Sequence, residues 1–211
     1  MKKYILFLNG KYSKNHIIFY NNLLAGKIKI AVDGGYKFFE KIKINPDVLI
    51  GDFDSVKLPK KISPTIEIYK FPKKKDKTDF ELALDYCFKN KADIIEVVMP
   101  DYGEIDHLLG NVVLLGKGFK PGIKIKLINY NYEIYPVKNS RLTISGMKSD
   151  IVSVIPNSNK VKMSCIGMDY NVKNLSLSST SSRALRNRIK NRRSVFEIKG
   201  EAFIIHLISN R

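Results

Sequence analysis

The sequence of 211 residues has no tryptophan and only two cysteines, Cys87 and Cys165. The cysteines lie far apart and lack CxxC spacing, which favours reduced, buried thiols in a cytoplasmic protein. The three histidines form no zinc-ligand pattern. No apolar run reaches the ~18 residues that a membrane-spanning helix needs, so we expect no membrane segment. The short apolar stretch near the start is interrupted by Lys11 and Lys14, which favours a core strand over a signal peptide.

Acidic residues are also scarce. The chain has 20 Asp and Glu against 37 Lys and Arg, a formal net charge of +17. Such a charge is typical of proteins that bind nucleic acid. The basic residues are spread along the whole chain, however, with only local runs at Lys73–Lys75 and Arg186–Arg193. We therefore favour a solvated basic surface and expect no nucleic-acid partner.

The first part of the chain alternates apolar strands with helical segments. The strands are predicted at residues 3–8, 29–32, 46–52, 65–71, 93–100 and 123–128, and the helices at 15–25, 36–41, 78–90 and 105–118. This rhythm predicts an α/β domain with a doubly wound, mainly parallel sheet. From about residue 129 onward, short alternating strands predict a C-terminal antiparallel β-sandwich. We thus expect two domains, residues 1–130 and residues 131–211.

The few acidic residues gather where predicted strands end or helices begin. Asp33, followed by two glycines, ends the second strand, and Asp52 and Asp54 follow the third. Asp79 opens one helix and Asp106 another. In an open parallel sheet, ligands bind beyond the carboxyl ends of the strands. The fold would therefore bring these carboxylates to one edge.

Carboxylates at Asp52, Asp54 and Asp79 suit a hard cation such as Mg²⁺, which prefers oxygen ligands. We expect an extended segment at Asp52-Phe53-Asp54, so that Asp52 and Asp54 face the same side, because alternate residues do. Gly34 and Gly35 would let the backbone approach a nucleotide, whose phosphates favour the amides at a helix start. Each motif alone is typical of a turn or a helix cap, but together they indicate an active site.

Four stretches carry a resemblance to a known family: "DGGYKFFEKIKINPDVLIGDFDSV", "KKKDKTDFELAL", "IDHLLGNVVLL" and, more weakly, "GMDYNV". The chain resembles the thiamin pyrophosphokinase (thiamine diphosphokinase) family. The resemblance implies an enzyme with an α/β catalytic domain and a C-terminal β-sandwich. It implies transfer of the diphosphate of ATP to the hydroxyl of thiamin, with Mg²⁺, giving thiamin diphosphate and AMP. It also implies a homodimer that holds thiamin between the catalytic domain of one subunit and the sandwich of the other.

The resemblance also implies roles for individual residues. The implied metal ligands are Asp52, Asp54 and Asp79. The implied nucleotide-binding residues are Asp33, Gly34, Gly35, Asp106 and His107. The implied catalytic residues are Lys75, Asp76 and Asp79, with either aspartate able to accept the proton of the thiamin hydroxyl. The implied thiamin-binding residues are Asn187 and Tyr170.

The sequence departs from the family pattern in two places. The family usually has an arginine in a glycine-rich turn before the Asp-His pair, whereas this chain has Glu104 there and keeps only Gly103. The family often has Ser-Asn-Glu near the thiamin pocket, whereas here Arg186 and Arg188 flank Asn187. These changes concern ATP and thiamin recognition more than the metal site.

Three other interpretations stay open. "DFDSV" also fits the loop of a phosphatase of the haloacid-dehalogenase type, with Asp52 as nucleophile and Asp54 as acid and base. A nucleic-acid-binding module using Arg183–Arg193 would show a steep salt dependence of its affinity. A degenerate family member would bind nucleotide without transferring diphosphate, or would use another acceptor.

Overall fold

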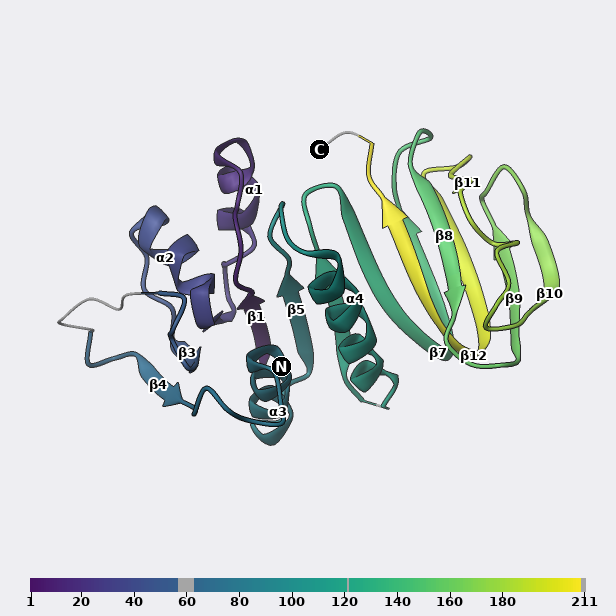
Figure 1. The fold of residues 1–211 in the computed structure, drawn as a ribbon. Helices are drawn as coiled ribbons and strands as arrows, with labels where there is room; N and C mark the ends of the chain where they lie inside the picture. The colour runs from purple at the N-terminus through teal and green to yellow at the C-terminus, as the bar shows by residue number, and fades with distance from the viewer. Residues whose placement is uncertain (57–62, 121, 210–211) are drawn as a thin grey trace. The chain divides into compact units, whose positions relative to one another are not determined.

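The computed structural model describes residues 1–56, 63–120 and 122–209, and the chain divides into two compact units. The first unit comprises Met1–Leu114 and Gly122–Asn129, and the second comprises Leu115–Pro121 and Tyr130–Arg211. In Figure 1 the first unit runs from purple to teal, and the strands of the second are green and yellow.

The first unit is built on a parallel sheet with the strand order β6-β5-β1-β2-β3-β4. Its strands are β1 (Lys3–Phe7), β2 (Ile28–Val32), β3 (Val48–Gly51), β4 (Glu67–Lys70), β5 (Ile94–Val98) and β6 (Lys124–Ile128). The chain moves outward from β1 to β4 and then returns to place β5 on the other side of β1. The strand order therefore reverses between β1 and β5, which makes this pair the topological switch point of the sheet.

Helices connect these strands. They are α1 (Ile17–Asn22), α2 (Tyr36–Ile42), α3 (Asp79–Lys89) and α4 (Ile105–Leu114), and short 3-10 turns are η1 (Lys14–His16), η2 (Asp33–Gly35) and, in the second unit, η3 (Leu115–Phe119). The side chain of Thr78 accepts a hydrogen bond from the backbone N–H of Glu81 and so caps α3. Because the first residue of α3 is Asp79, this cap also fixes where that carboxylate lies.

Aromatic side chains fill the core of the first unit in place of tryptophan. Phe7 on β1 stacks on Phe38 of α2, with the ring centroids 4.2 Å apart, and meets Phe39 edge-on at 5.1 Å. Tyr20 of α1 and Tyr12 complete the cluster through T-shaped contact at 5.3 Å. Such pairs contribute about 0.5–1.5 kcal/mol each beyond the burial of their area. The cluster holds α1 and α2 against β1.

The second unit is antiparallel. Its strands are β7 (Tyr132–Ser145), β8 (Ile151–Pro156), β9 (Val161–Ile166), β10 (Val172–Leu177), β11 (Asn187–Arg188) and β12 (Arg193–Leu207). The long strands β7 and β12 run side by side, and β9 and β8 pair with successive halves of β12. The inward side chains form one buried cluster that includes Val154, Met163 and Phe196.

The expectation of short strands throughout the second unit is wrong for two of them, because β7 has 14 residues and β12 has 15. Both strands continue through polar and glycine-containing stretches that are typical of turns. The register shifts between Ile198 and Glu201, where Gly200 has φ +104° and donates its N–H to Asn139 Oδ1 at 2.8 Å. This is a β-bulge, which inserts residues without ending a strand. The polar and glycine residues that resemble a turn therefore bend the strand instead.

The change from parallel to antiparallel strands along the chain confirms the expected mixed architecture. Cys87 and Cys165 are free and buried, as predicted. Within the described ranges, no helix has the length and apolarity required to span a membrane.

Candidate metal and nucleotide site

Four aspartates meet near the carboxyl ends of β2 and β3 in the first unit. Asp33 begins η2 directly after β2, and Asp52 and Asp54 follow β3. Asp79 is the first residue of α3. We call Asp33, Asp52, Asp54 and Asp79 the aspartate cluster. Parallel pairing of β2 with β3 places the ends of both strands at the same edge.

The oxygens of Asp33, Asp52 and Asp54 can meet a single ion, because one oxygen from each lies within 4.8 Å of the others. Asp33 is buried, and its Oδ2 accepts a 2.6 Å hydrogen bond from Ser55 Oγ. Among the described residues, Asp33 Oδ1 is buried with no hydrogen-bond partner. An unpaired buried carboxylate oxygen is costly, so a ligand that supplies positive charge would relieve it.

Asp52 and Asp54 come together through a turn, which corrects the expected extended segment. Phe53 between them has a left-handed φ of +61°, and the backbone N–H of Asp54 donates to Asp52 Oδ1 at 3.1 Å. That hydrogen bond lowers the pKa of Asp52 below its usual value. Partial burial acts in the opposite direction, and the ammonium of Lys75 lowers the pKa further. Asp52 is thus held ionised, as a metal ligand must be.

Lys75 bridges two members of the cluster. Its Nζ lies 3.1 Å from Asp52 Oδ2 and 3.0 Å from Asp79 Oδ1, and its side chain is only 14% exposed. Burial opposes the charged form, but hydrogen bonds and charges from Asp79 and Asp52 raise the pKa of Lys75. Burial raises the pKa of Asp79, while Lys75 works in the opposite direction. The ammonium therefore supplies positive charge that these carboxylates require.

A second lysine reaches the outer side of the cluster. Lys73 Nζ lies 2.6 Å from Asp54 Oδ2, with both side chains largely exposed. Two ammonium groups thus face three of the four carboxylates, and one oxygen of Asp33 has no partner among the residues that the structure describes. An acidic cluster that attracts cations and offers only oxygen ligands fits Mg²⁺.

The two glycines after Asp33 are required by the neighbouring strand. A Cβ on Gly34 would lie 2.0 Å from Asn9 Oδ1, and one on Gly35 would lie 2.0 Å from the carbonyl oxygen of Phe7. The turn after β2 therefore lies directly against the end of β1. This close contact gives the glycines a packing role in addition to the predicted approach of a nucleotide.

Asp106 and His107 lie on the first turn of α4, where both are exposed. They form a second group with Glu104, with one ligand atom of each within 4.8 Å of the others. The backbone N–H of His107 donates to Asp106 Oδ1 at 2.7 Å. Asp76 is exposed just before α3. Of the predicted catalytic residues, Asp79 thus belongs to the aspartate cluster and Lys75 contacts it. Asp76, Asp106 and His107 lie on exposed turns of the same unit.

In the second unit, Asn187 and Tyr170 are paired with each other. Asn187 Oδ1 accepts from the backbone N–H of Tyr170 at 3.1 Å, and Asn187 Nδ2 donates to the backbone oxygen of Tyr170 at 2.7 Å. Tyr170 is 76% exposed. The amide of Asn187 is therefore used to hold the Tyr170 backbone, which leaves the ring of Tyr170 as the group available for stacking.

The sequence did not single out Ser55 or Lys73 as functional residues. Ser55 belongs to the Gly-Asp-Phe-Asp-Ser stretch, and its adjacency to Asp54 was the available signal. Lys73 lies in a lysine run that we interpreted as solvated surface. Nothing in that run distinguishes the lysine that pairs with Asp54 from its neighbours.

The first unit is a parallel α/β unit that gathers candidate oxygen ligands for a cation near the ends of β2 and β3. It therefore defines an α/β protein with a candidate ligand site at the carboxyl edge of its sheet. Comparison with known proteins narrows the class. The sequence profile of the family described as "Thiamin pyrophosphokinase, catalytic domain" matches residues 20–127. Thiamine pyrophosphokinase of Bacillus subtilis is 31% identical over 174 residues, which cover 79% of this chain and 80% of that protein. The chain therefore belongs to the thiamin pyrophosphokinase family.

Solved structures agree with this assignment. The crystal structure of thiamine pyrophosphokinase from Bacillus subtilis has a TM-score of 0.84 at 28% identity, covering 99% of this chain and 100% of that one. Thiamin pyrophosphokinase from Geobacillus thermodenitrificans has a TM-score of 0.79 at 25% identity, covering 97% and 98%. Thiamin pyrophosphokinase from Candida albicans shares the fold with a TM-score of 0.76 at 17% identity, covering 98% and 90%.

Proposed function

We propose that this protein transfers the diphosphate of ATP to the hydroxyl of thiamin, giving thiamin diphosphate and AMP. One observation carries the proposal within the family. In the described part of the chain, the aspartate cluster combines a buried oxygen of Asp33 that has no hydrogen-bond partner with a lysine that bridges Asp52 and Asp79. Such a site attracts a divalent cation and, through it, the phosphates of a nucleotide.

Asp52, Asp54 and Asp79 are the proposed ligands of Mg²⁺. When bound, the ion would neutralise part of the negative charge on the phosphate oxygens. Asp33 lies beside them with its orphaned oxygen directed to no protein donor in the described part of the chain. The hydrogen bond from Ser55 keeps the other oxygen of Asp33 in place.

The protein's own residues then place the reactants and move one proton. Lys75 is positioned by two carboxylates and can donate to phosphate oxygens in exchange for them. The thiamin hydroxyl must give up its proton, and Asp76 and Asp79 are the two proposed acceptors. Holding the two reactants in line can lower the activation free energy by up to about 7–11 kcal/mol.

The remaining assignments are proposals that follow from the family. Residues 1–130 would form the doubly wound catalytic domain, with the nucleotide near Asp33, Gly34, Gly35, Asp106 and His107. Residues 131–211 would form a β-sandwich that contributes Tyr170, held by Asn187, to thiamin recognition. A homodimer, a cytoplasmic location and the absence of a nucleic-acid partner complete the proposal.

A turnover assay with two matched variants tests the proposal. Purified protein is mixed with ATP, Mg²⁺ and thiamin, and AMP and thiamin diphosphate are measured by chromatography. We expect the wild type to make AMP and thiamin diphosphate in equal amounts. The control variant Asp85→Asn alters a carboxylate that lies on α3, as Asp79 does, but outside the aspartate cluster, and it should do the same. We expect Asp79→Asn to lose both products.

Two outcomes would contradict the proposal. ATP binding without thiamin diphosphate would identify a family member that no longer transfers diphosphate to thiamin. Full activity of Asp79→Asn would show that the aspartate cluster is not the reaction centre.

A further inference from the structure

A further carboxylate of the first unit, that of Asp101, has a nearly buried side chain and lies at the switch point of the parallel sheet. It follows β5, and the residues that it binds follow β1, the adjacent strand. The backbone N–H of Asp101 donates to the carbonyl oxygen of Lys11 at 3.0 Å, and Lys11 forms an isolated bridge with Tyr102. The turn after β5 is thus joined to the segment after β1.

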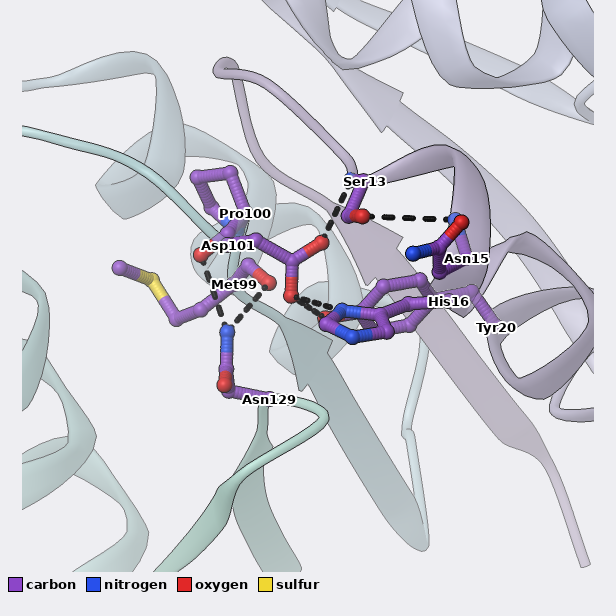
Figure 2. A network of polar contacts seen from close by, with 8 residues as sticks. All are labelled: Ser13, Asn15, His16, Tyr20, Met99, Pro100, Asp101 and Asn129. Carbon is purple, nitrogen blue, oxygen red and sulfur yellow. Dashed lines mark hydrogen bonds and ion pairs between the residues drawn. The ribbon is translucent and has the colours of Figure 1, made fainter. Parts of the chain in front are cut away.

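The carboxylate of Asp101 accepts hydrogen bonds from three groups of that segment and of α1, as Figure 2 shows. Asp101 Oδ2 accepts from the backbone N–H of Ser13 at 2.7 Å. Asp101 Oδ1 lies 2.8 Å from His16 Nδ1 and accepts from the hydroxyl of Tyr20 at 2.8 Å. The side chain of Asp101 is only 4% exposed. A buried charge is tolerated when hydrogen bonds replace its water, so these contacts hold the segment in a defined position.

The same turn is anchored from its other side. Asn129, directly after β6, donates from Nδ2 to the carbonyl oxygen of Pro100 at 3.0 Å (Figure 2). The backbone N–H of Met99 donates to the carbonyl oxygen of Ile128 at 2.8 Å. The turn after β5 is therefore fixed between the ends of β1 and β6.

Both joined segments lead to the proposed nucleotide residues. The segment after β1 begins with Asn9, whose side chain lies against Gly34. The turn after β5 continues into α4, whose first turn carries Asp106 and His107. In open α/β sheets the ligand occupies the crevice at the switch point, beyond the carboxyl ends of the two strands. The Asp101 contacts lie at this end of β1 and β5.

We propose that Asp101 is a positioning residue for nucleotide binding, because it fixes together the two segments that border the switch point. This inference rests on the proposed function of the site. The proposed metal ligands follow β3 or begin α3, whereas Asp101 acts between β1 and β5. Loss of its contacts therefore weakens ATP binding more than it slows the transfer step.

Isothermal titration of ATP with Mg²⁺ into three proteins tests the inference: wild type, Asp101→Ala and Asp101→Asn. We expect Asp101→Ala to raise the dissociation constant of ATP at least about tenfold, because three donors lose their acceptor. Asp101→Asn retains an acceptor and should bind ATP with an intermediate constant. Glu40→Ala, which removes an exposed carboxylate of α2, is the matched control and should bind like the wild type. In turnover assays, the KM for ATP should rise with a smaller change in kcat.

Tyr20→Phe removes only one donor to Asp101 and keeps the buried ring, so it tests the inference if Asp101→Ala does not fold. This variant should also raise the dissociation constant of ATP. Folded Asp101→Ala or Tyr20→Phe with a wild-type dissociation constant for ATP would overturn the inference, as would a fall in kcat at constant KM. Wild-type protein that binds ATP but makes no thiamin diphosphate would refute the proposed function and leave this inference intact. Wild-type protein that does not bind ATP would overturn both.

Discussion

Replacing Lys75 by methionine (Lys75→Met) removes the ammonium that bridges Asp52 and Asp79. The two oxygens lie 3.1 and 3.0 Å from Lys75 Nζ, and the three side chains are 14–20% exposed. Removal of one partner from a buried ion pair costs about 3–5 kcal/mol, because the remaining charge is left without compensation. Since these side chains keep some exposure, we expect the free energy of unfolding without Mg²⁺ to fall by about 3 kcal/mol.

Added Mg²⁺ should restore part of this loss. A ligand that binds only the folded state at a hundred times its dissociation constant stabilises it by about 2.7 kcal/mol. In wild-type protein the ion must displace the ammonium of Lys75 from the carboxylates, whereas in Lys75→Met it meets no such competitor. A given concentration of Mg²⁺ should therefore stabilise Lys75→Met more than the wild type.

Urea unfolding with and without Mg²⁺ measures both effects. Lys77→Met is the matched control, because Lys77 pairs with Asp85 at 2.7 Å on a more exposed surface. Loss of this exposed pair should lower stability less than loss of Lys75 does, and it should leave the response to Mg²⁺ unchanged. Two results would refute the charge balance that we assign to the cluster. One is a free energy of unfolding of Lys75→Met, without Mg²⁺, that equals that of the wild type. The other is a greater stabilisation by Mg²⁺ of the wild type than of Lys75→Met.

Three further substitutions test other parts of the structure. Gly34→Ala should lower stability by about 1–3 kcal/mol in thermal unfolding, because its Cβ would lie 2.0 Å from Asn9 Oδ1; an unchanged Tm would contradict this contact. Thr78→Ala removes the cap of α3 and should cost about 1 kcal/mol in urea unfolding, and no change would show that the cap is dispensable. Burial opposes the ionisation of Asp150, but two backbone amides and His206 hold its pKa below the usual value. The ionised Asp150 therefore stabilises the folded protein at pH values above about 3.9, the pKa of the carboxyl group in the unfolded chain. This stabilisation is lost as the pH falls through the lower pKa that Asp150 has in the folded protein. Asp150→Asn should be less stable than the wild type at pH 7, and the difference should shrink in acid; a difference that grew in acid would refute this sign.

The location of the aspartate cluster could be predicted from the sequence because parallel strands end at a common edge. Once Asp33 and Asp52 are placed after successive strands, their proximity follows from the topology. The turn at Phe53 could not be predicted, since a left-handed φ is uncommon for an aromatic residue. The two carboxylates still meet, but through a hydrogen-bonded turn and not through strand alternation.

Long-range pairing explains what the sequence left hidden. Asp101 binds residues that lie 81–88 positions earlier in the chain, and no local pattern connects them. Lys73 resembles every other lysine in its basic run until the fold brings Asp54 beside it. In the second unit, Gly200 resembles a turn residue, because a bulge and a turn use the same backbone conformations. In these places tertiary contacts, and not local propensity, decide the structure.

The most direct test of the central claim follows the phosphorus of ATP. Wild-type protein is incubated with Mg²⁺, thiamin and ATP labelled in its β-phosphate, and the labelled products are separated by chromatography. Our account requires the label in thiamin diphosphate, with unlabelled AMP in equal amount. Label in ADP or in free phosphate or diphosphate, with none on thiamin, would contradict it.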